Sequence, residues 1–365
     1  MKTSLRNSSP HNSNHRTAWR TTHMQLVATL SSSPRLVALS LGVGGAATFL
    51  VVRRMRRGAC QMALVPYDEF SMFHENCAEH GIPYSGPPVV RRERVVLSDG
   101  RALSALVWGR GPPELVLLHG GAQNAHTWDT VSLALGRPLA CIDLPSHGHS
   151  DSAAGGVNDP AAAAADVAQV MDALAPDAAA VVGMSFGGLT GIELSALRPD
   201  LVRRLVLIDV TPGVTRTKAK GVLDFVAKGP ATFGSFDELL ARTMHHNPTR
   251  SEASLRRGIL HNAKQLPDSS WVWRHARFRG TERQARTPRQ IDYSRLWSKL
   301  EAVAAPLMLV RGMRPQSMVD DTDEAEVVRR QPDCRVERVA EAGHSVQGDQ
   351  PVALAELLTS FVDVR

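Results

Sequence analysis

The chain has few cysteines and no cysteine motif of a metal site. Its 365 residues include four cysteines, which lie far apart and form neither a CxxC pair nor a cysteine and histidine cluster with metal-ligand spacing. We therefore expect reduced thiols and no structural zinc. Cys141 falls inside an apolar run, where a free cysteine usually behaves as a small buried hydrophobic residue. The others are Cys60, Cys77 and Cys334.

Nucleotide, flavin and metal fingerprints are also missing. The one glycine-rich stretch near the start, Gly42–Gly45, follows no strand pattern and has no βαβ frame around it. The sequence therefore predicts an activity without a cofactor or a metal.

Acidic residues are absent from the start of the chain. Residues 1–66 carry nine of the 42 basic residues and none of the 36 acidic ones, so the formal net charge of +6 originates there. The rest of the chain holds 33 basic and 36 acidic residues. Because this larger part is slightly acidic, the composition argues against a nucleic-acid-binding protein.

An apolar run, residues 36–52, ends in an arginine-rich cluster, 53–57. Seventeen residues reach the lower limit for crossing a bilayer, so one explanation is a membrane anchor that leaves the catalytic part in the cytoplasm, on the side of the denser positive charge. A second explanation is that translation begins at Met62. A third is an organelle-targeting leader, which would account for the arginine and serine content without acids. All three explanations remain open at this point.

From Val89 onward, short apolar runs rich in β-branched residues alternate with helical patterns. This alternation is typical of an α/β protein with a mostly parallel sheet and helices on both faces. Asp99-Gly100 between the first two runs is a hairpin signal, so we expect an antiparallel start. The eight expected strands are 89–97, 103–108, 115–118, 139–142, 178–182, 205–208, 307–310 and, more weakly, 335–339; residues 160–174 and 186–197 are expected to be helices.

The pattern changes between Pro212 and about Pro306, where helical segments and tryptophans replace the strands. The segment is too long for a loop, and we expect a helical cap inserted over the carboxyl edge of the sheet. The predicted organisation is a basic leader 1–61, an N-terminal extension 62–88, a core of 89–212 and 300–365, and a cap 213–299.

The strongest chemical motif is Gly183-Met184-Ser185-Phe186-Gly187, between an expected strand and an expected helix. A bare GxSxG pattern would occur by chance in about one protein in eight of this length. The strand and the helix around it make it more specific, because a sharp turn there holds a strained serine at the top of the sheet. We therefore predict that Ser185 is a nucleophile.

A serine hydroxyl is a poor nucleophile until a base removes its proton, so a histidine is needed at the same edge of the sheet. His344 follows the last expected strand and precedes a helix that begins at Pro351. A loop at this place can present the imidazole to Ser185. We predict that His344 is the general base, the alternative being a surface histidine in a turn.

Backbone donors for an oxyanion are expected in two places. One N–H would come from Gly121 or Ala122, in the His-Gly-Gly-Ala sequence directly after an expected strand, and the other from Phe186. Losing one such donor typically removes ~3 kcal/mol of transition-state stabilisation. His119, which opens this sequence, is interpreted as a structural residue.

Taken together, four motifs resemble the α/β-hydrolase fold family, from about Val89 to the C-terminus. The resemblance implies an eight-stranded sheet with a helical cap, hydrolysis through an acyl-serine intermediate, and structural roles for His147 and His149. Family members most often carry glycine where this chain has Ser146, a difference confined to a turn. The motifs are His119-Gly120-Gly121, Asp143-Leu144-Pro145-Ser146-His147-Gly148-His149-Ser150, Gly183-Met184-Ser185-Phe186-Gly187-Gly188 and Ala342-Gly343-His344.

The acidic member of a Ser-His-Asp triad has more than one candidate. In many relatives it follows the seventh strand, but residues 313–316 contain no carboxylate, and Asp320 and Asp321 come slightly late. Some relatives place the acid after the sixth strand, where Asp209 lies. We prefer Asp209 and keep the other two as alternatives. The acid would fix the tautomer of the imidazole and stabilise the imidazolium.

The predicted substrate is a small uncharged carboxylic ester or a related acyl compound. Trp271, Trp273, Phe225 and Phe233 of the cap are candidates for the wall of an acyl pocket, although packing within the cap explains each equally well. Cleavage of a C–C bond, an amide or a lactone by the same residues is an alternative, because one fold hosts many reactions. A ligand-binding protein that has lost turnover is another. Dehalogenase and epoxide hydrolase chemistry is disfavoured, because those relatives use aspartate where this chain has Ser185.

Overall fold

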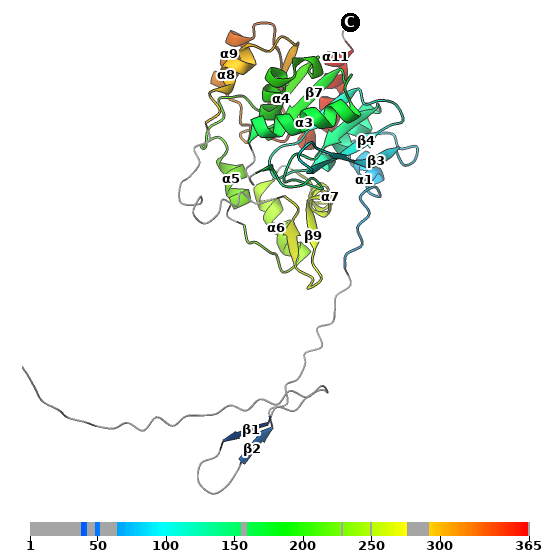
Figure 1. The fold of residues 1–365 in the computed structure, drawn as a ribbon, viewed down its shortest axis with the longest axis vertical. Coiled ribbons are helices and arrows are strands. Elements are labelled where there is room, and N and C mark those ends of the chain that lie inside the picture. The colour runs from blue at the N-terminus through cyan, green and yellow to red at the C-terminus, as the bar shows by residue number, and fades with distance from the viewer. Residues whose placement is uncertain are drawn as a thin grey trace, which may run out of the picture. The chain divides into compact units, whose positions relative to one another are not determined.

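The computed structural model describes residues 64–154, 159–227, 229–248, 250–275 and 292–363, together with two short strands nearer the N-terminus. The chain divides into two units, Met1–Cys60 and Gln61–Arg365. Figure 1 shows the second unit as a sheet surrounded by helices.

In the first unit, β1 (Ala38–Leu41) pairs antiparallel with β2 (Thr48–Val51). These strands lie within the run 36–52, for which a membrane anchor was one of three explanations. None of the helices in the described part of the chain is long and apolar enough to cross a membrane. In place of the spanning helix that the anchor would need, the described residues of this run form two short paired strands. The explanations based on a targeting leader or on a start at Met62 concern residues outside those described.

The second unit is built on an eight-stranded sheet with the order β12-β11-β8-β7-β5-β6-β4-β3. The first strand pairs are antiparallel, as the Asp-Gly hairpin signal predicted, and the pairs from β6 through β12 are parallel. All eight predicted strands are confirmed. They are β3 (Val90–Val96), β4 (Ala102–Trp108), β5 (Leu115–Leu118), β6 (Leu139–Ile142), β7 (Ala180–Met184), β8 (Leu205–Ile208), β11 (Leu307–Gly312) and β12 (Arg335–Val339).

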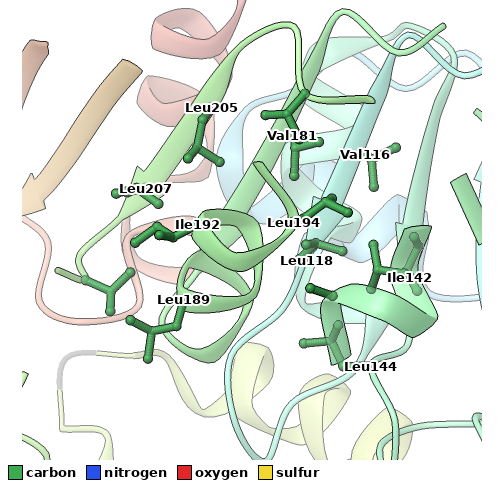
Figure 2. Close-up of a cluster of buried hydrophobic side chains, with 14 of the residues drawn as sticks. Val116, Leu118, Ile142, Leu144, Val181, Leu189, Ile192, Leu194, Leu205 and Leu207 are labelled. Carbon is green, nitrogen blue, oxygen red and sulfur yellow. The ribbon is translucent and has the colours of Figure 1, made fainter. Parts of the chain in front are cut away.

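The central strands are apolar along their whole length because both faces of the sheet are covered. Successive residues of one strand enter different hydrophobic clusters: Val181 belongs to one cluster and Val182 to the other. In Figure 2, Ile192 of a covering helix lies beside Leu207 of the sheet, and both belong to the first cluster. Cys141 is fully buried in the second cluster, as predicted.

Helices cover each face of the sheet. The first cluster includes residues of α3 and α4, and the second includes residues of α1, α2 and α11 (Figure 1). The predicted helices 160–174 and 186–197 match α3 and α4. The helices of the core are α1 (Phe73–His80), α2 (Asp129–Leu135), α3 (Pro160–Leu174), α4 (Phe186–Leu197), α9 (Asp321–Arg330), α10 (Val346–Asp349) and α11 (Pro351–Val362), with 3-10 turns η1 (Ala125–Trp128) and η3 (Pro199–Leu201).

The segment between β8 and β11 lies largely at one end of the sheet (Figure 1) and has a small hydrophobic cluster of its own, which includes Phe233, Leu239 and Trp271. Its last helix, α8, crosses the predicted boundary at residue 299 and packs into the core of the sheet through Leu296 and Leu300. The elements are α5 (Lys220–Ala227), α6 (Phe236–His246), α7 (Glu252–Asn262), β9 (Ala263–Gln265), β10 (Trp271–Trp273) and α8 (Leu296–Glu301). We call the part from α5 to β10 the cap segment.

Candidate active site

Ser185 lies in the tight turn between β7 and α4. Its backbone has φ 52° and ψ −118°, a strained conformation for a residue with a side chain. Gly183 and Gly187 make the turn sterically feasible, because a Cβ on Gly183 would overlap the carbonyl of Gly187, and one on Gly187 would overlap the carbonyl of Leu118. The geometry is that of the nucleophile elbow that the sequence predicted.

Asp209 and His344 are joined by a hydrogen bond from ring Nδ1 to Oδ2 at 2.9 Å. Asp209 directly follows β8, is fully buried, and has φ 48°, a left-handed conformation that aspartate tolerates better than most residues. Its carboxylate also accepts the N–H of Gly312 at 3.0 Å, the N–H of Met318 at 2.8 Å and the hydroxyl of Ser317 at 2.5 Å. The three other donors therefore hold this carboxylate in the orientation in which it accepts the hydrogen bond from His344.

The two alternative acids have other partners. Asp320 caps the N-terminus of α9, where its carboxylate accepts the N–H of Asp323 at 2.9 Å, and it pairs with Lys218 at 2.7 Å. The side chain of Asp321 is 96% exposed and pairs with Arg311 at 2.7 Å. In the structure, neither carboxylate is bonded to His344, so the preference for Asp209 agrees with the geometry.

The expected backbone donors differ in how they are used. The N–H of Ala122 donates to Nε2 of His147 at 3.1 Å, so this donor is engaged within the protein. The N–H groups of Gly121 and Phe186 have no acceptor in the described part of the chain. Gly121 and Ser185 line one cavity. The alternative that used Ala122 is corrected accordingly, and Gly121 and Phe186 remain the candidate pair.

Three histidines near the elbow have structural environments. The Nε2 atoms of His119 and His147 accept backbone N–H groups of Leu144 at 2.9 Å and Ala122 at 3.1 Å, which requires the neutral form of each ring. Burial lowers the pKa of His119, and it lowers the pKa of His147 to about 3. Burial, aided by the charge of Arg92, lowers the pKa of His149 to about 4. The rings of His119 and His147 therefore support loops as neutral hydrogen-bonding groups.

A cavity of ≈ 230 Å³ contains Ser185 and His344 in its wall. Of the four predicted aromatic residues, Phe225 and Trp273 line it, with their rings in edge contact at 5.7 Å between centroids. Trp271 and Phe233 do not line it; they are 4% and 1% exposed within the hydrophobic cluster of the cap segment. The predicted acyl wall is therefore corrected to Phe225 and Trp273.

The cap segment is hydrogen-bonded to the loop that carries Gly121. The side-chain amide of Asn124 donates to the backbone oxygen of His261 and to Oδ1 of Asn262, both at 2.9 Å. Asn262 in turn donates from Nδ2 to the carbonyl of Ala122 at 3.1 Å. The end of α7 is thus held against the candidate oxyanion loop.

His126, Asp129 and His261 bring buried atoms of metal-ligand type within 4.8 Å of one another. The two rings are stacked at 3.8 Å with an interplanar angle of 11°, so their in-plane lone pairs can meet at one ion only after a ring turns. His126 contacts Asp129 at 2.9 Å and Glu69 at 3.3 Å. Burial opposes charge on His126, but these carboxylates outweigh it and raise the pKa to about 9. In this arrangement the group is an ion network around an imidazolium.

Several polar residues of the site were not anticipated from the sequence. Ser317 lies just beyond the stretch where an acid was expected, and that gap is the one signal that could have drawn attention to it. Asn124 contacts Asn262, which lies more than 100 residues further along the chain, and Arg250 lines the cavity. Nothing in the sequence around these three residues indicates such contacts.

Comparisons with known proteins agree with this geometry. A model of the alpha/beta hydrolase family matches residues 115–357. The esterase Rv0045c of Mycobacterium tuberculosis is 41% identical over 308 residues, which cover 83% of this chain and 98% of the relative. Its crystal structure has a TM-score of 0.70 and covers 83% of this chain and 100% of that chain.

More distant relatives share the same fold. An sn-1-specific diacylglycerol lipase, ABHD11 of Xenopus laevis, is 27% identical over 267 residues, which cover 69% of this chain and 80% of the relative. The structure of E-2-(acetamidomethylene)succinate hydrolase is 23% identical, with a TM-score of 0.65 over 76% of this chain and all of that chain, and shows the fold alone. The chain is therefore a hydrolase that belongs to the α/β-hydrolase family.

Proposed function

We propose that this hydrolase cleaves carboxylic esters with a small acyl group through an acyl-serine intermediate. The observation that carries the proposal is the hydrogen bond between Asp209 and His344, in a cavity whose wall also contains the strained Ser185. The 41% identity to a protein described as an esterase supports the choice of an ester bond.

In the first step, the Ser185 oxygen attacks the acyl carbon while His344 Nε2 takes the hydroxyl proton. Asp209 holds Nδ1 and stabilises the resulting imidazolium. The negative charge that develops on the carbonyl oxygen is met by the N–H groups of Gly121 and Phe186. The C–O bond to the alcohol then breaks, and the alcohol leaves with the proton from His344.

In the second step, His344 takes a proton from a water molecule, whose oxygen attacks the acyl carbon of the intermediate. Collapse of this second tetrahedral species releases the carboxylic acid and returns the proton to Ser185. Because both steps develop charge on the same oxygen, one pair of backbone donors serves both.

The first experiment is labelling of residues 62–365 by a fluorophosphonate, with wild type and Ser185→Ala compared. An activated serine at this position would give labelling that disappears in the variant. A folded wild-type protein that takes no label and hydrolyses no short ester would overturn the proposal.

Two alternative functions use the same residues differently. A C–C, amide or lactone hydrolase would share Ser185 and His344, and turnover of matched ester and amide substrates separates these reactions. The alternative of a non-catalytic binding protein was supported by the missing carboxylate after the seventh strand. The bond between Asp209 and His344 removes that support.

A further inference from the structure

Arg250 lines the cavity that contains Ser185, and its charge has no direct counterion. Nη2 donates to the hydroxyl of Ser254, but Nε and Nη1 have no acceptor within the described residues. The guanidinium forms no ion pair with a described carboxylate. Burial lowers the pKa of Arg250, yet a guanidinium remains protonated in proteins. The cavity wall therefore carries a partly desolvated cation with unused donors.

The nearest acidic groups are already engaged. Asp349 and Glu79 are the carboxylates whose charges act on Arg250. Asp349 accepts the N–H of Gly343 at 2.8 Å. Glu79 pairs with a different arginine, Arg257. In the structure, neither acid forms a direct hydrogen bond or ion pair with Arg250.

Arg257 lies on α7, the helix that begins two residues after Arg250; it also lines the cavity and provides a contrast. Its Nε donates to Asn76 at 2.7 Å, and its terminal nitrogens pair with Glu79 and with Glu75. Arg257 therefore ties α7 to α1 as a satisfied structural residue. Such partners are what a purely structural arginine acquires when it is buried, and Arg250 lacks them.

The position of Arg250 relates it to the reaction centre. Its Nη1 lies 2.5 Å from the position that a Cβ on Gly348 would take, so the guanidinium rests directly against α10. This helix begins two residues after His344, and Ser345, Gln347 and Gly348 line the cavity beside it. A ligand whose ester group is at Ser185 can therefore extend within the same cavity toward Arg250.

We propose that Arg250 binds a carboxylate carried by the substrate at the end remote from the ester bond. This inference rests on the proposed esterase function and names its substrate class, a monoester with one free carboxylate. A guanidinium offers two parallel N–H donors that match the two oxygens of a carboxylate. This substrate is charged, so the inference departs from the small uncharged ester predicted from the sequence, and neutral short esters remain slower substrates.

The test compares ester pairs that differ in charge and little in shape. In one arm the carboxylate is on the acyl part: monomethyl succinate, glutarate and adipate are each compared with the ester in which an amide replaces the carboxylate. In the other arm it is on the alcohol part, as in acetate esters of 3-hydroxypropionate and 4-hydroxybutyrate and their amides. Acid release in a pH-stat gives kcat/KM, and the charged-to-neutral ratio is the readout.

We expect the wild-type ratio to exceed one in one of the two arms, by roughly 10- to 100-fold for a charge-assisted pair. Arg250→Gln should abolish this preference, and Arg250→Lys should retain part of it, because a point charge replaces the planar fork. Arg256→Gln is the matched control: Arg256, on the helix that follows Arg250, stacks over Phe236 and does not line the cavity. Its ratio should equal that of wild type.

Two outcomes would overturn the inference: a wild-type ratio at or below one in both arms, or an equal loss on charged and neutral esters in Arg250→Gln. The amide esters keep this result distinct from failure of the proposed function. If the neutral esters are hydrolysed and Ser185→Ala abolishes their turnover, only the role of Arg250 has failed. If no ester is hydrolysed by the folded wild type, the esterase function itself has failed.

Discussion

The two walls of the cavity are held in place by different kinds of interaction. On the side of the sheet, Ser185 and Asp209 occupy strained positions at strand ends, and four donors fix the Asp209 carboxylate. On the side of the cap segment, Phe225 lies on α5, Arg250 precedes α7, and Trp273 lies on β10 and packs against a small separate cluster. The backbone of the sheet thus sets one wall, and side-chain packing sets the other.

This difference assigns chemistry and selectivity to separate parts of the molecule. Changes in the wall on the sheet should remove the reaction, because the reacting groups have no substitute. Changes in the cap segment should alter stability or the choice of substrate while the reaction persists.

The largest effect is expected from the reacting pair. Ser185→Ala and His344→Ala should each lower kcat on a short ester by about 10⁶-fold, because the two residues act as one unit. The double variant should be little worse than either single one. Steady-state kinetics with active-site titration measures this, and a double variant far below both singles would argue against a shared pathway.

The second-largest effect on kcat is expected from the acid of the triad. Asp209→Asn should lower kcat by about 10⁴-fold, because the amide favours the wrong tautomer of His344. A paired Asp320→Asn and Asp321→Asn variant should stay within a few-fold of wild type. If the paired variant alone abolished turnover, the assignment of the acid would be wrong.

In the cap segment, two tryptophans two positions apart on β10 should behave differently. Trp271→Ala removes a side chain buried in the cap cluster and should cost about 3–5 kcal/mol of stability. Trp273→Ala, in the cavity wall, should cost less stability and shift KM among acyl chain lengths. Urea denaturation and ester kinetics measure the two effects. Equal losses of stability in the two variants would contradict the assignment of Trp271 to the cap cluster and of Trp273 to the cavity wall.

The ion network between the walls should make stability depend on pH. The folded-state pKa of His126, about 9, lies above its ordinary value of 6.5, so this group stabilises the fold fully below about pH 6.5. That contribution, on the order of 3 kcal/mol, is lost as the pH rises through about 9. Thermal denaturation from pH 6 to 10 should show the decline in wild type and a flatter curve in His126→Gln. Parallel curves for wild type and His126→Gln would show that His126 does not cause the loss of stability.

The sequence predicted well wherever the backbone is the cause. The central strands follow from short apolar runs buried on both faces, and the elbow follows from glycines whose missing Cβ atoms prevent overlap. His344 and Asp209 were placed by chain order relative to these strands, and their hydrogen bond agrees with that order.

Prediction was poorer where contacts between distant segments are the cause. Trp271 and Trp273 are alike in local sequence, but Trp271 is buried in the cap cluster, whereas Trp273 packs against that cluster and lines the cavity. The run 36–52, for which a membrane anchor was one explanation, contains two paired strands. Arg250 precedes α7 and Arg256 lies on it, and only their contacts in the folded chain separate their roles.

The hydrogen bonds of Asn124 and Asn262 limit how this protein can be recombined with its relatives. The end of α7 completes the bonding of the loop beside Gly121, so a chimera that exchanged the cap segment alone would leave the Ala122 carbonyl and the Asn124 amide without their partners. A transplanted cap segment must therefore carry an equivalent of Asn262, because without it the loop beside Gly121 would lose hydrogen bonds that hold it in place.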